Sequence, residues 1–283
     1  MATLINGRQL ADSMQEQMRL EVEKLGKQNA FPALVVFLVG DDPASKTYIK
    51  NKEIAAQKIG IHTKLEHYPS DISEEKLLIE IKKYNDNPHY HGILVQLPLP
   101  EHIDEEKVLL NIDPKKDVDG FHPINMGKLL SGKAEAIPCT PYGIMKMFES
   151  YEIKLSEKNA IVIGRSNIVG KPMAQLLLAK NATVTMAHSY TKNLAALAKQ
   201  ADIIVSAVGK GNFVTKEFVR KGAVVIDVGM NRDENGKLIG DVKFDEVEPI
   251  AIYITPVPKG VGPMTITMLM QQTIQACKRQ ELS

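Results

Sequence analysis

One stretch of the chain decides its fold: Ala160-Ile161-Val162-Ile163-Gly164-Arg165-Ser166-Asn167-Ile168-Val169-Gly170-Lys171-Pro172. A short apolar segment runs into a turn of small residues and then into a predicted helix, which is the order of elements at the phosphate site of a dinucleotide-binding unit. Gly164 and Gly170 let the backbone approach a pyrophosphate at the positive end of the helix. The usual glycine fingerprint has further glycines at positions 166 and 169, where this chain has Ser166 and Val169, so the motif alone is a weak match.

Apolar segments and helical segments alternate on both sides of this stretch. Toward the C-terminus we expect strands at 160–163, 182–187, 202–207, 223–228 and 251–255, with helices at 170–180, 191–199 and 215–220. Toward the N-terminus we expect strands at 33–39, 61–68 and 92–97, with helices at 7–25, 43–59 and 73–85. Such alternation is typical of parallel sheets covered by helices. The predicted fold class is α/β, with two α/β domains that have mostly parallel sheets, the second of them Rossmann-like.

A proline-broken connection, Ile137-Pro138-Cys139-Thr140-Pro141, separates the two series. A helix at 142–150 follows it and links the domains. A final helix at 264–280 has no place in the second series, so we expect it to fold back onto the first domain. The predicted domains are residues 1–139 together with 264–283, and residues 140–263, with an active-site cleft between them.

Composition narrows the function. The chain has 283 residues, 24% of them charged, and a formal net charge of +1. Such a small net charge does not indicate the strongly basic surface that binds nucleic acid or an anionic membrane. No apolar run approaches the roughly 18 residues that span a bilayer, and the N-terminus lacks a signal-peptide pattern. The cysteines Cys139 and Cys277 fit a reducing compartment and no zinc pattern. We expect a cytoplasmic protein with small-molecule partners and no metal.

The segment after the second strand of the Rossmann-like domain bears on the cofactor. An acidic residue there would bind the ribose hydroxyls of NAD and repel a 2′-phosphate. The chain has no acidic residue between Ala187 and Lys192. Arg165 and Ser189 both donate to phosphate oxygens, so NADP is favoured. Position alone leaves open that Arg165 is a solvated turn residue and Ser189 a helix cap.

Other loops carry glycines where a ligand is expected. Gly209 and Gly229-Met230 follow strands of the second domain, and ligands bind at the carboxyl ends of parallel strands. The segment 253–265 holds three prolines and two glycines, so its backbone can approach a flat ligand closely. We expect Thr265 to cap the final helix.

The first domain holds the candidate chemistry. Tyr48 and Lys52 lie four residues apart on the predicted helix 43–59, so they share a face. This helix carries three more lysines, and spacing alone favours a solvated face. Gln96 ends an apolar run, where a buried polar group needs a partner. Asp119 belongs to the acidic turn 117–120, and a turn or capping role explains such a carboxylate equally well.

Taken together, these motifs closely resemble the bifunctional methylenetetrahydrofolate dehydrogenase/methenyltetrahydrofolate cyclohydrolase family. The resemblance covers almost the whole chain in order and rests on Tyr48-x-x-x-Lys52, Val95-Gln96-Leu97-Pro98-Leu99, Asp117-Val118-Asp119-Gly120, Pro138-Cys139-Thr140-Pro141, Gly164-Arg165-Ser166-x-x-Val169-Gly170-Lys171-Pro172, Val225-Ile226-Asp227-Val228-Gly229 and Gly260-Val261-Gly262-Pro263-Met264-Thr265. One position departs, because Lys259 stands where the family usually has glycine.

The resemblance implies a function in tetrahydrofolate interconversion, one-carbon metabolism and purine biosynthesis. A hydride passes from 5,10-methylenetetrahydrofolate to NADP⁺, and water then converts the methenyl product to 10-formyltetrahydrofolate. The family's members are typically homodimers through the sheet edge of the second domain.

The resemblance also assigns residues. Lys52 would exchange a proton during hydration, oriented by Gln96, while Tyr48 stacks on the folate and Asp119 accepts hydrogen bonds from the pterin. The substrate site would include the same four residues and the loop residues Pro258, Gly260, Val261, Gly262 and Pro263. The cofactor site would be formed by Gly164, Arg165, Ser166, Val169, Gly170, Ser189, Gly209, Gly229 and Met230.

Two rival functions remain. One is a monofunctional, NAD-linked methylenetetrahydrofolate dehydrogenase; Lys52 and Gln96 count against it, as does the missing acidic residue after the second strand. The other is a non-catalytic folate or nucleotide sensor, which has no need for a lysine and a glutamine beside a cofactor turn.

Overall fold

The computed structural model describes residues 1–282, and these divide into two compact units. Unit 1 contains Met1–Ala11 and Thr140–Thr265, and unit 2 contains Asp12–Cys139 and the chain from Ile266 onward. The chain passes between the units at three points, within α1 (Gly7–Gly26), at the start of α6 (Cys139–Ser150) and within α10 (Val261–Glu281). Among residues 1–282, no helix is long and apolar enough to cross a membrane.

Unit 2 is built on a three-stranded parallel sheet in the order β3-β2-β4. Its strands are β2 (Ala33–Val39), β3 (His62–Tyr68) and β4 (Gly92–Val95). Its own helices are α2 (Pro43–Ile59), α3 (Glu74–Asn85), α4 (Glu105–Leu110) and α5 (Pro123–Leu130). The three strands and the first two helices were predicted, whereas α4 and α5 are too short to give a clear periodic signal.

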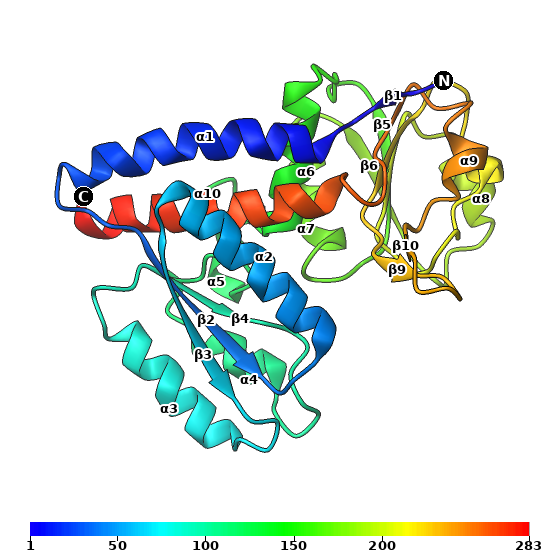
Figure 1. Cartoon of the computed structure of the whole chain (residues 1–283). Helices are drawn as coiled ribbons and strands as arrows, with labels where there is room; N and C mark the ends of the chain where they lie inside the picture. The colour runs from blue at the N-terminus through cyan, green and yellow to red at the C-terminus, as the bar shows by residue number, and fades with distance from the viewer. Residues whose placement is uncertain (283) are drawn as a thin grey trace. The chain divides into compact units, whose positions relative to one another are not determined.

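The strand order of unit 2 reverses at β2. The chain crosses from β2 to β3 on one side and then returns past β2 to β4 on the other, so right-handed crossovers place α2 and α3 on opposite faces of the sheet (Figure 1). One face packs Val35 and Phe37 against apolar residues of α3 and α4. In such sheets ligands bind beyond the carboxyl ends of the strands at the reversal, which here are β2 and β4.

Capping explains why α2 begins and ends where it does. The Asp42 carboxylate accepts a hydrogen bond from the Ser45 backbone N–H at 2.7 Å, and Pro43 occupies the first helical position. Gly60 ends the helix with φ +85°, a left-handed conformation that glycine adopts without strain. The helix that carries Tyr48 and Lys52 is therefore fixed at both ends.

Unit 1 is built on a six-stranded parallel sheet in the order β1-β11-β8-β7-β5-β6. Its strands are β1 (Thr3–Leu4), β5 (Asn159–Ile163), β6 (Thr183–Ala187), β7 (Ile203–Ser206), β8 (Val224–Asp227) and β11 (Tyr253–Ile254). Besides the start of α1, its helices are α6 (Cys139–Ser150), α7 (Gly170–Ala179), α8 (Leu194–Ala198), the 3₁₀ turn η1 (Lys216–Phe218) and α9 (Phe244–Val247). A small hairpin joins β9 (Asn231–Arg232) to β10 (Leu238–Ile239). The predicted Rossmann-like order is present, and its switch point lies between β5 and β7.

Several predicted elements differ from the structure. Residues 1–11 were predicted in the first domain, but β1 pairs in parallel with β11 and so belongs to unit 1. Ser189 caps no helix, because α8 begins only at Leu194. Thr265 is not the cap of the final helix either. That helix begins at Val261, and the Thr265 hydroxyl donates back to the Val261 carbonyl oxygen at 3.5 Å.

Candidate active site

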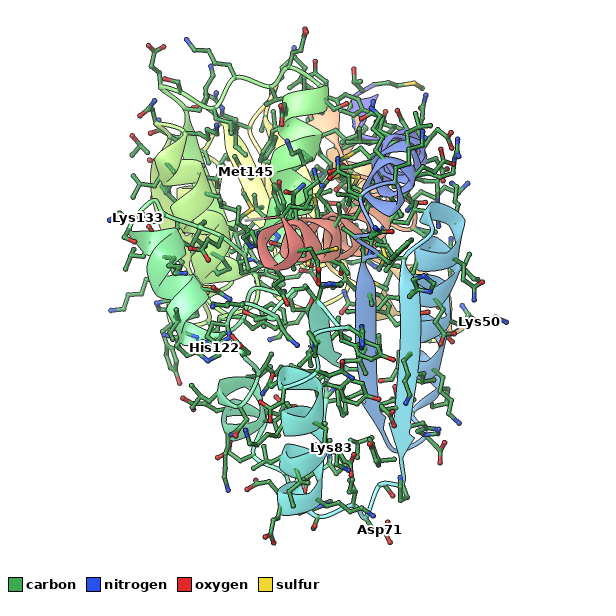
Figure 2. The ribbon with its side chains drawn as sticks, turned by 90° about the vertical axis from the view of Figure 1, so that its left-hand side faces the viewer. Lys50, Asp71, Lys83, His122, Lys133 and Met145 are labelled. Atoms are coloured by element: carbon green, nitrogen blue, oxygen red, sulfur yellow. The ribbon has the colours of Figure 1, made fainter. Side chains whose placement is uncertain are left out.

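Lys52 is a buried lysine on α2. Only 7% of its surface is exposed. Its Nζ donates a hydrogen bond to Gln96 Oε1 at 3.0 Å and lies 5.1 Å from the centre of the Tyr48 ring. Lys50 lies two residues away on the opposite side of α2, where it is exposed and extends outward (Figure 2). The solvated-face interpretation therefore holds for Lys50 and is wrong for Lys52.

Gln96 meets Lys52 because of the strand order. It follows β4, while α2 follows β2, and these two strands are neighbours at the switch point of the sheet. The Gln96 amide nitrogen donates to the Leu97 carbonyl oxygen at 2.8 Å. This bond fixes the orientation of the amide, so that its oxygen accepts from the lysine.

Burial shifts the pKa values of both Lys52 and Tyr48. It lowers the pKa of Lys52 because a charged ammonium is poorly solvated there, although the nearby carboxylate of Asp119 acts in the opposite direction. Burial also raises the pKa of Tyr48 to about 12, so its phenol stays neutral. An amine with a lowered pKa is suited to accept a proton near neutral pH.

The two carboxylates of the acidic turn have separate functions. Asp117 accepts hydrogen bonds from the backbone N–H groups of Gly120 and His122, each at 2.9 Å, and from the Asn125 amide at 2.8 Å. Asp117 therefore organises the turn. Burial raises the pKa of Asp119 to about 6, while the positive charge of Lys52 opposes the shift. Asp119 is the carboxylate left for a ligand.

Two neighbours of Asp119 were not predicted. Cys139 was not predicted to act in the site, yet its buried thiol donates to the Val118 carbonyl oxygen at 3.3 Å. Gln272 of α10 donates to the carbonyl oxygens of Val118 at 2.7 Å and Ile137 at 2.8 Å, and accepts from the Ile137 backbone N–H at 2.6 Å. No motif marks Gln272, which lies more than a hundred residues from its partners.

In unit 1, the turn after β5 has the geometry of a phosphate site. Gly164 has φ +131°, and a Cβ there would lie 2.4 Å from the Ala207 carbonyl oxygen. A Cβ on Gly170 would lie 2.3 Å from the carbonyl oxygen of Gly164. Only glycine fits at either position. The Ser166 hydroxyl lies within 3.4 Å of the Val169 and Gly170 backbone nitrogens and accepts from both. These hydrogen bonds hold the start of α7 against the exposed turn 165–168.

Arg165 extends from this turn toward the segment after β6. Its guanidinium lies 5.6 Å from the centre of the Tyr190 ring, next to Ser189 in sequence. Arg165, Ser189 and Tyr190 are all exposed, and within residues 1–282 Arg165 forms no ion pair. A free guanidinium and a hydroxyl beside a glycine turn fit the 2′-phosphate of NADP.

The remaining predicted cofactor and loop residues also lie in unit 1. Gly209 and Met230 are exposed in the loops after β7 and β8, whereas Gly229 is buried. The loop residues Pro258, Gly260, Val261, Gly262 and Pro263 lie between β11 and the first turn of α10. The structure thus brings Tyr48, Lys52, Gln96 and Asp119 together in unit 2, and the other predicted residues belong to unit 1.

Lys259 carries a conformation that the sequence did not reveal. Its φ is +80°, in the left-handed region that a glycine would adopt without cost. This is the position at which the chain departs from the resembled family. The backbone of the loop is therefore kept even though its side chain differs.

Family models match both parts of the chain. The tetrahydrofolate dehydrogenase/cyclohydrolase catalytic domain matches residues 5–119, and the NAD(P)-binding domain of the same family matches residues 138–281. The chain belongs to the tetrahydrofolate dehydrogenase/cyclohydrolase family. The buried Lys52 site thus lies in the catalytic domain of this family and the Gly164 turn in its NAD(P)-binding domain.

Known members of the tetrahydrofolate dehydrogenase/cyclohydrolase family are similar over the full length. A bifunctional protein FolD of Enterococcus faecalis is 70% identical over 281 residues, covering 99% of this chain and 100% of that protein. The crystal structure of FolD from Campylobacter jejuni is 46% identical with a TM-score of 0.97, covering 99% of each chain. FolD of Trypanosoma brucei, solved with NADP and an inhibitor, is 36% identical with a TM-score of 0.96, covering 100% of this chain and 99% of that one.

Proposed function

We propose that this chain oxidises 5,10-methylenetetrahydrofolate to 5,10-methenyltetrahydrofolate with NADP⁺ and hydrolyses the product to 10-formyltetrahydrofolate. The observation that carries the proposal is the buried Lys52, held by Gln96 and Tyr48 near Asp119. Membership of a dehydrogenase/cyclohydrolase family supports both activities. A chain that only oxidised its substrate would have no need for an amine held in this way.

Unit 1 supplies the cofactor residues. Gly164 and Gly170 keep the turn open to a pyrophosphate, and Ser166 belongs to the same turn. Arg165 and Ser189 would bind the 2′-phosphate. NADP⁺, when bound, supplies the hydride acceptor. The transfer needs no acid or base from the protein, so the chain contributes binding and orientation.

Unit 2 supplies the proton transfer for hydrolysis. As water adds to the methenyl carbon, its oxygen forms the new C–O bond and Lys52, as the neutral amine, accepts one proton. The remaining hydroxyl proton then passes to N5 as the bond between N5 and the one-carbon unit breaks and the formyl C=O forms. Lys52 finally releases its proton to solvent, which balances the reaction. Gln96 keeps the lysine nitrogen in place throughout.

Recognition of the folate follows from the neighbouring groups. Asp119, with its pKa at about 6, is mainly a carboxylate at neutral pH and accepts paired N–H bonds from the aminopyrimidine edge of the pterin. The neutral ring of Tyr48 stacks on the folate. The loop residues Pro258, Gly260, Val261, Gly262 and Pro263 would contact the same ligand.

The setting of the activity follows the family. We infer a cytoplasmic homodimer that acts in one-carbon metabolism and contributes formyl groups to purine biosynthesis. NADP is preferred over NAD because the segment after β6 has no acidic residue and Arg165 is free to bind phosphate. The NADP complex of the Trypanosoma brucei relative supports this preference.

Replacing Lys52 by Met tests the proposal. A thioether cannot accept a proton, so we expect cyclohydrolase activity on 5,10-methenyltetrahydrofolate to fall by roughly 100-fold or more, the usual range of general acid–base catalysis. NADP⁺ affinity, measured by calorimetry, should stay within about twofold, because the cofactor residues belong to unit 1.

The matched control is Lys50→Met on the exposed side of the same helix. It should leave both quantities unchanged. Equal loss of cofactor affinity and cyclohydrolase activity in Lys52→Met would indicate misfolding rather than chemistry. Full cyclohydrolase activity in Lys52→Met would remove the lysine from the mechanism.

A further inference from the structure

A second buried carboxylate network lies in unit 1, outside the residues assigned so far. Asp241 lies between β10 and α9 and has no exposed surface. Asp227, at the end of β8, is 3% exposed. Buried carboxylates are expensive unless their oxygens accept hydrogen bonds. The partners of Asp241 therefore show what it does.

Asp241 accepts hydrogen bonds from one loop in particular. Its Oδ2 accepts from the backbone N–H groups of Val208 at 2.7 Å and Gly209 at 3.3 Å, and its Oδ1 accepts from that of Lys210 at 3.0 Å. Ser206 Oγ, at the end of β7, and Asn231 Nδ2, after β8, donate to the same carboxylate at 3.3 and 3.0 Å. One side chain thus joins the loops that follow two central strands.

Asp227 holds the backbone of Asp241 in place. Its carboxylate accepts from the backbone N–H groups of Asp241 and Val242, each at 2.9 Å. A Cβ on Gly229 would lie 2.4 Å from Asp241 Oδ1, and one on Gly240 would lie 1.8 Å from Asp227 Oδ2. These two glycines leave the room that the carboxylates fill, so Asp241 has a single possible position.

The loop that Asp241 holds borders the phosphate turn. Ala207, the residue before it, lies so close to Gly164 that a Cβ there would be 2.4 Å from the Ala207 carbonyl oxygen. Since β7 and β5 are neighbours, the loop and the turn form the two sides of the switch point. The N–H groups of Val208, Gly209 and Lys210 point at Asp241 and are not available to a phosphate. The loop can therefore contact a ligand through its carbonyl oxygens and through packing, but not through these N–H groups.

We propose that Asp241 is a positioning residue for NADP⁺ binding, which holds the loop 208–210 in the conformation that receives the uncharged part of the cofactor beside the Gly164 turn. The inference rests on the proposed function, because it assumes NADP⁺ as the ligand. Asp241 acts through the backbone of the loop and touches no reacting atom.

The test is Asp241→Asn, which keeps the shape but replaces one acceptor oxygen by an NH₂ group that faces backbone donors. We expect the KM for NADP⁺ and its Kd by calorimetry to rise at least tenfold. The KM for 5,10-methylenetetrahydrofolate should change less than threefold, and cyclohydrolase activity on added 5,10-methenyltetrahydrofolate less than twofold. Asp245→Asn, an exposed acid-to-amide change on α9, is the control and should match the parent protein.

The split between KM and kcat separates positioning from structure. A purely structural loss lowers the fraction of active protein, so the apparent kcat falls while the KM for NADP⁺ stays constant. That result, or an unchanged Kd, would overturn the inference. Failure of the proposed function is recognised separately, because the parent protein itself would then show no NADP⁺-dependent oxidation.

Discussion

At the scale of single residues, we expect Arg165 to decide which cofactor is preferred. Its guanidinium is exposed above Tyr190 and unpaired within the described part of the chain. In Arg165→Glu a negative charge replaces the donor, so we expect the KM for NADP⁺ to rise at least tenfold while that for NAD⁺ changes by less than about threefold. A charged hydrogen bond contributes about 1.5–3 kcal/mol, and 1.4 kcal/mol corresponds to a factor of ten. Steady-state kinetics with both cofactors measures the ratio.

Lys180→Glu is the matched charge reversal, because Lys180 is exposed beyond the other end of α7. It should leave the ratio of the two KM values as it is. An unchanged ratio in Arg165→Glu would show that the 2′-phosphate is bound by other residues.

Lys259 gives a second prediction at this scale. Its φ of +80° places an L-residue in the left-handed region, which costs roughly 1–2 kcal/mol. Replacement by glycine removes that cost and adds some unfolded-state entropy. We therefore expect Lys259→Gly to raise the free energy of unfolding by about 1 kcal/mol, measured by urea denaturation. Lys237→Gly, at an exposed position without positive φ, should lower it. A lower free energy of unfolding for Lys259→Gly would contradict the claim that the backbone at Lys259 is strained.

The sequence predicted which residues form the site better than it predicted their burial and their hydrogen-bond partners. Tyr48 and Lys52 were recognised by spacing and family motif, but burial, which separates Lys52 from Lys50, depends on how α2 packs. The division between Asp117 and Asp119 was likewise invisible, since it depends on which carboxylate the backbone N–H groups of the turn reach.

At the scale of elements, α10 anchors the turn that carries Asp119. Gln272 is 4% exposed and makes hydrogen bonds to Val118 and to both backbone groups of Ile137. Gln272→Leu removes the partner of both Ile137 backbone groups and leaves the Val118 carbonyl oxygen with the Cys139 thiol, so we expect a loss of about 2–4 kcal/mol in the free energy of unfolding. The urea midpoint, followed by circular dichroism, measures it.

Gln275→Leu on the same helix is the comparison. Within residues 1–282 the Gln275 side chain makes one hydrogen bond, to Glu21 at 3.5 Å, and its loss should cost well under about 1 kcal/mol. Equal effects of the two substitutions would show that Gln272 contributes no more than an ordinary helix residue.

Long, periodic elements were predicted closely, as were the four-residue strands β4, β7 and β8, whereas other short elements were not. The strand 33–39 and the helix 43–59 have the predicted bounds because apolar runs, an N-cap and a terminal glycine mark them. The predicted helix 215–220 is only the 3₁₀ turn η1. The two-residue strand β1 has no signal of its own, since it exists only by pairing with β11.

At the scale of the whole molecule, buried acids make stability depend on pH. Burial raises the pKa of Asp227 from 3.8 to about 7, although three backbone N–H groups oppose the shift. The native state therefore holds a proton that the unfolded state has lost, and this stabilisation disappears as the pH rises through 7. Between pH 5 and pH 8 we therefore expect the free energy of unfolding to fall by about 3 kcal/mol, at 1.36 kcal/mol per pKa unit.

Urea denaturation at both pH values, on the parent protein and on Asp227→Asn, isolates this contribution. The variant should lose the Asp227 part of the decline and keep the part of the same sign that Asp119 adds. His91, whose pKa burial lowers, acts in the opposite direction and is common to both proteins. A decline of equal size in both proteins would remove Asp227 as its source.

The central claim is that one chain carries out both reactions with NADP⁺. The direct measurement mixes the purified protein with 5,10-methylenetetrahydrofolate and either NADP⁺ or NAD⁺, and follows the reduced cofactor, the methenyl product and the 10-formyl product separately. We expect faster reduction of NADP⁺ than of NAD⁺, and conversion to 10-formyltetrahydrofolate faster than uncatalysed hydrolysis. Accumulation of the methenyl compound would make the chain a monofunctional dehydrogenase, and no reduction of either cofactor would contradict the account.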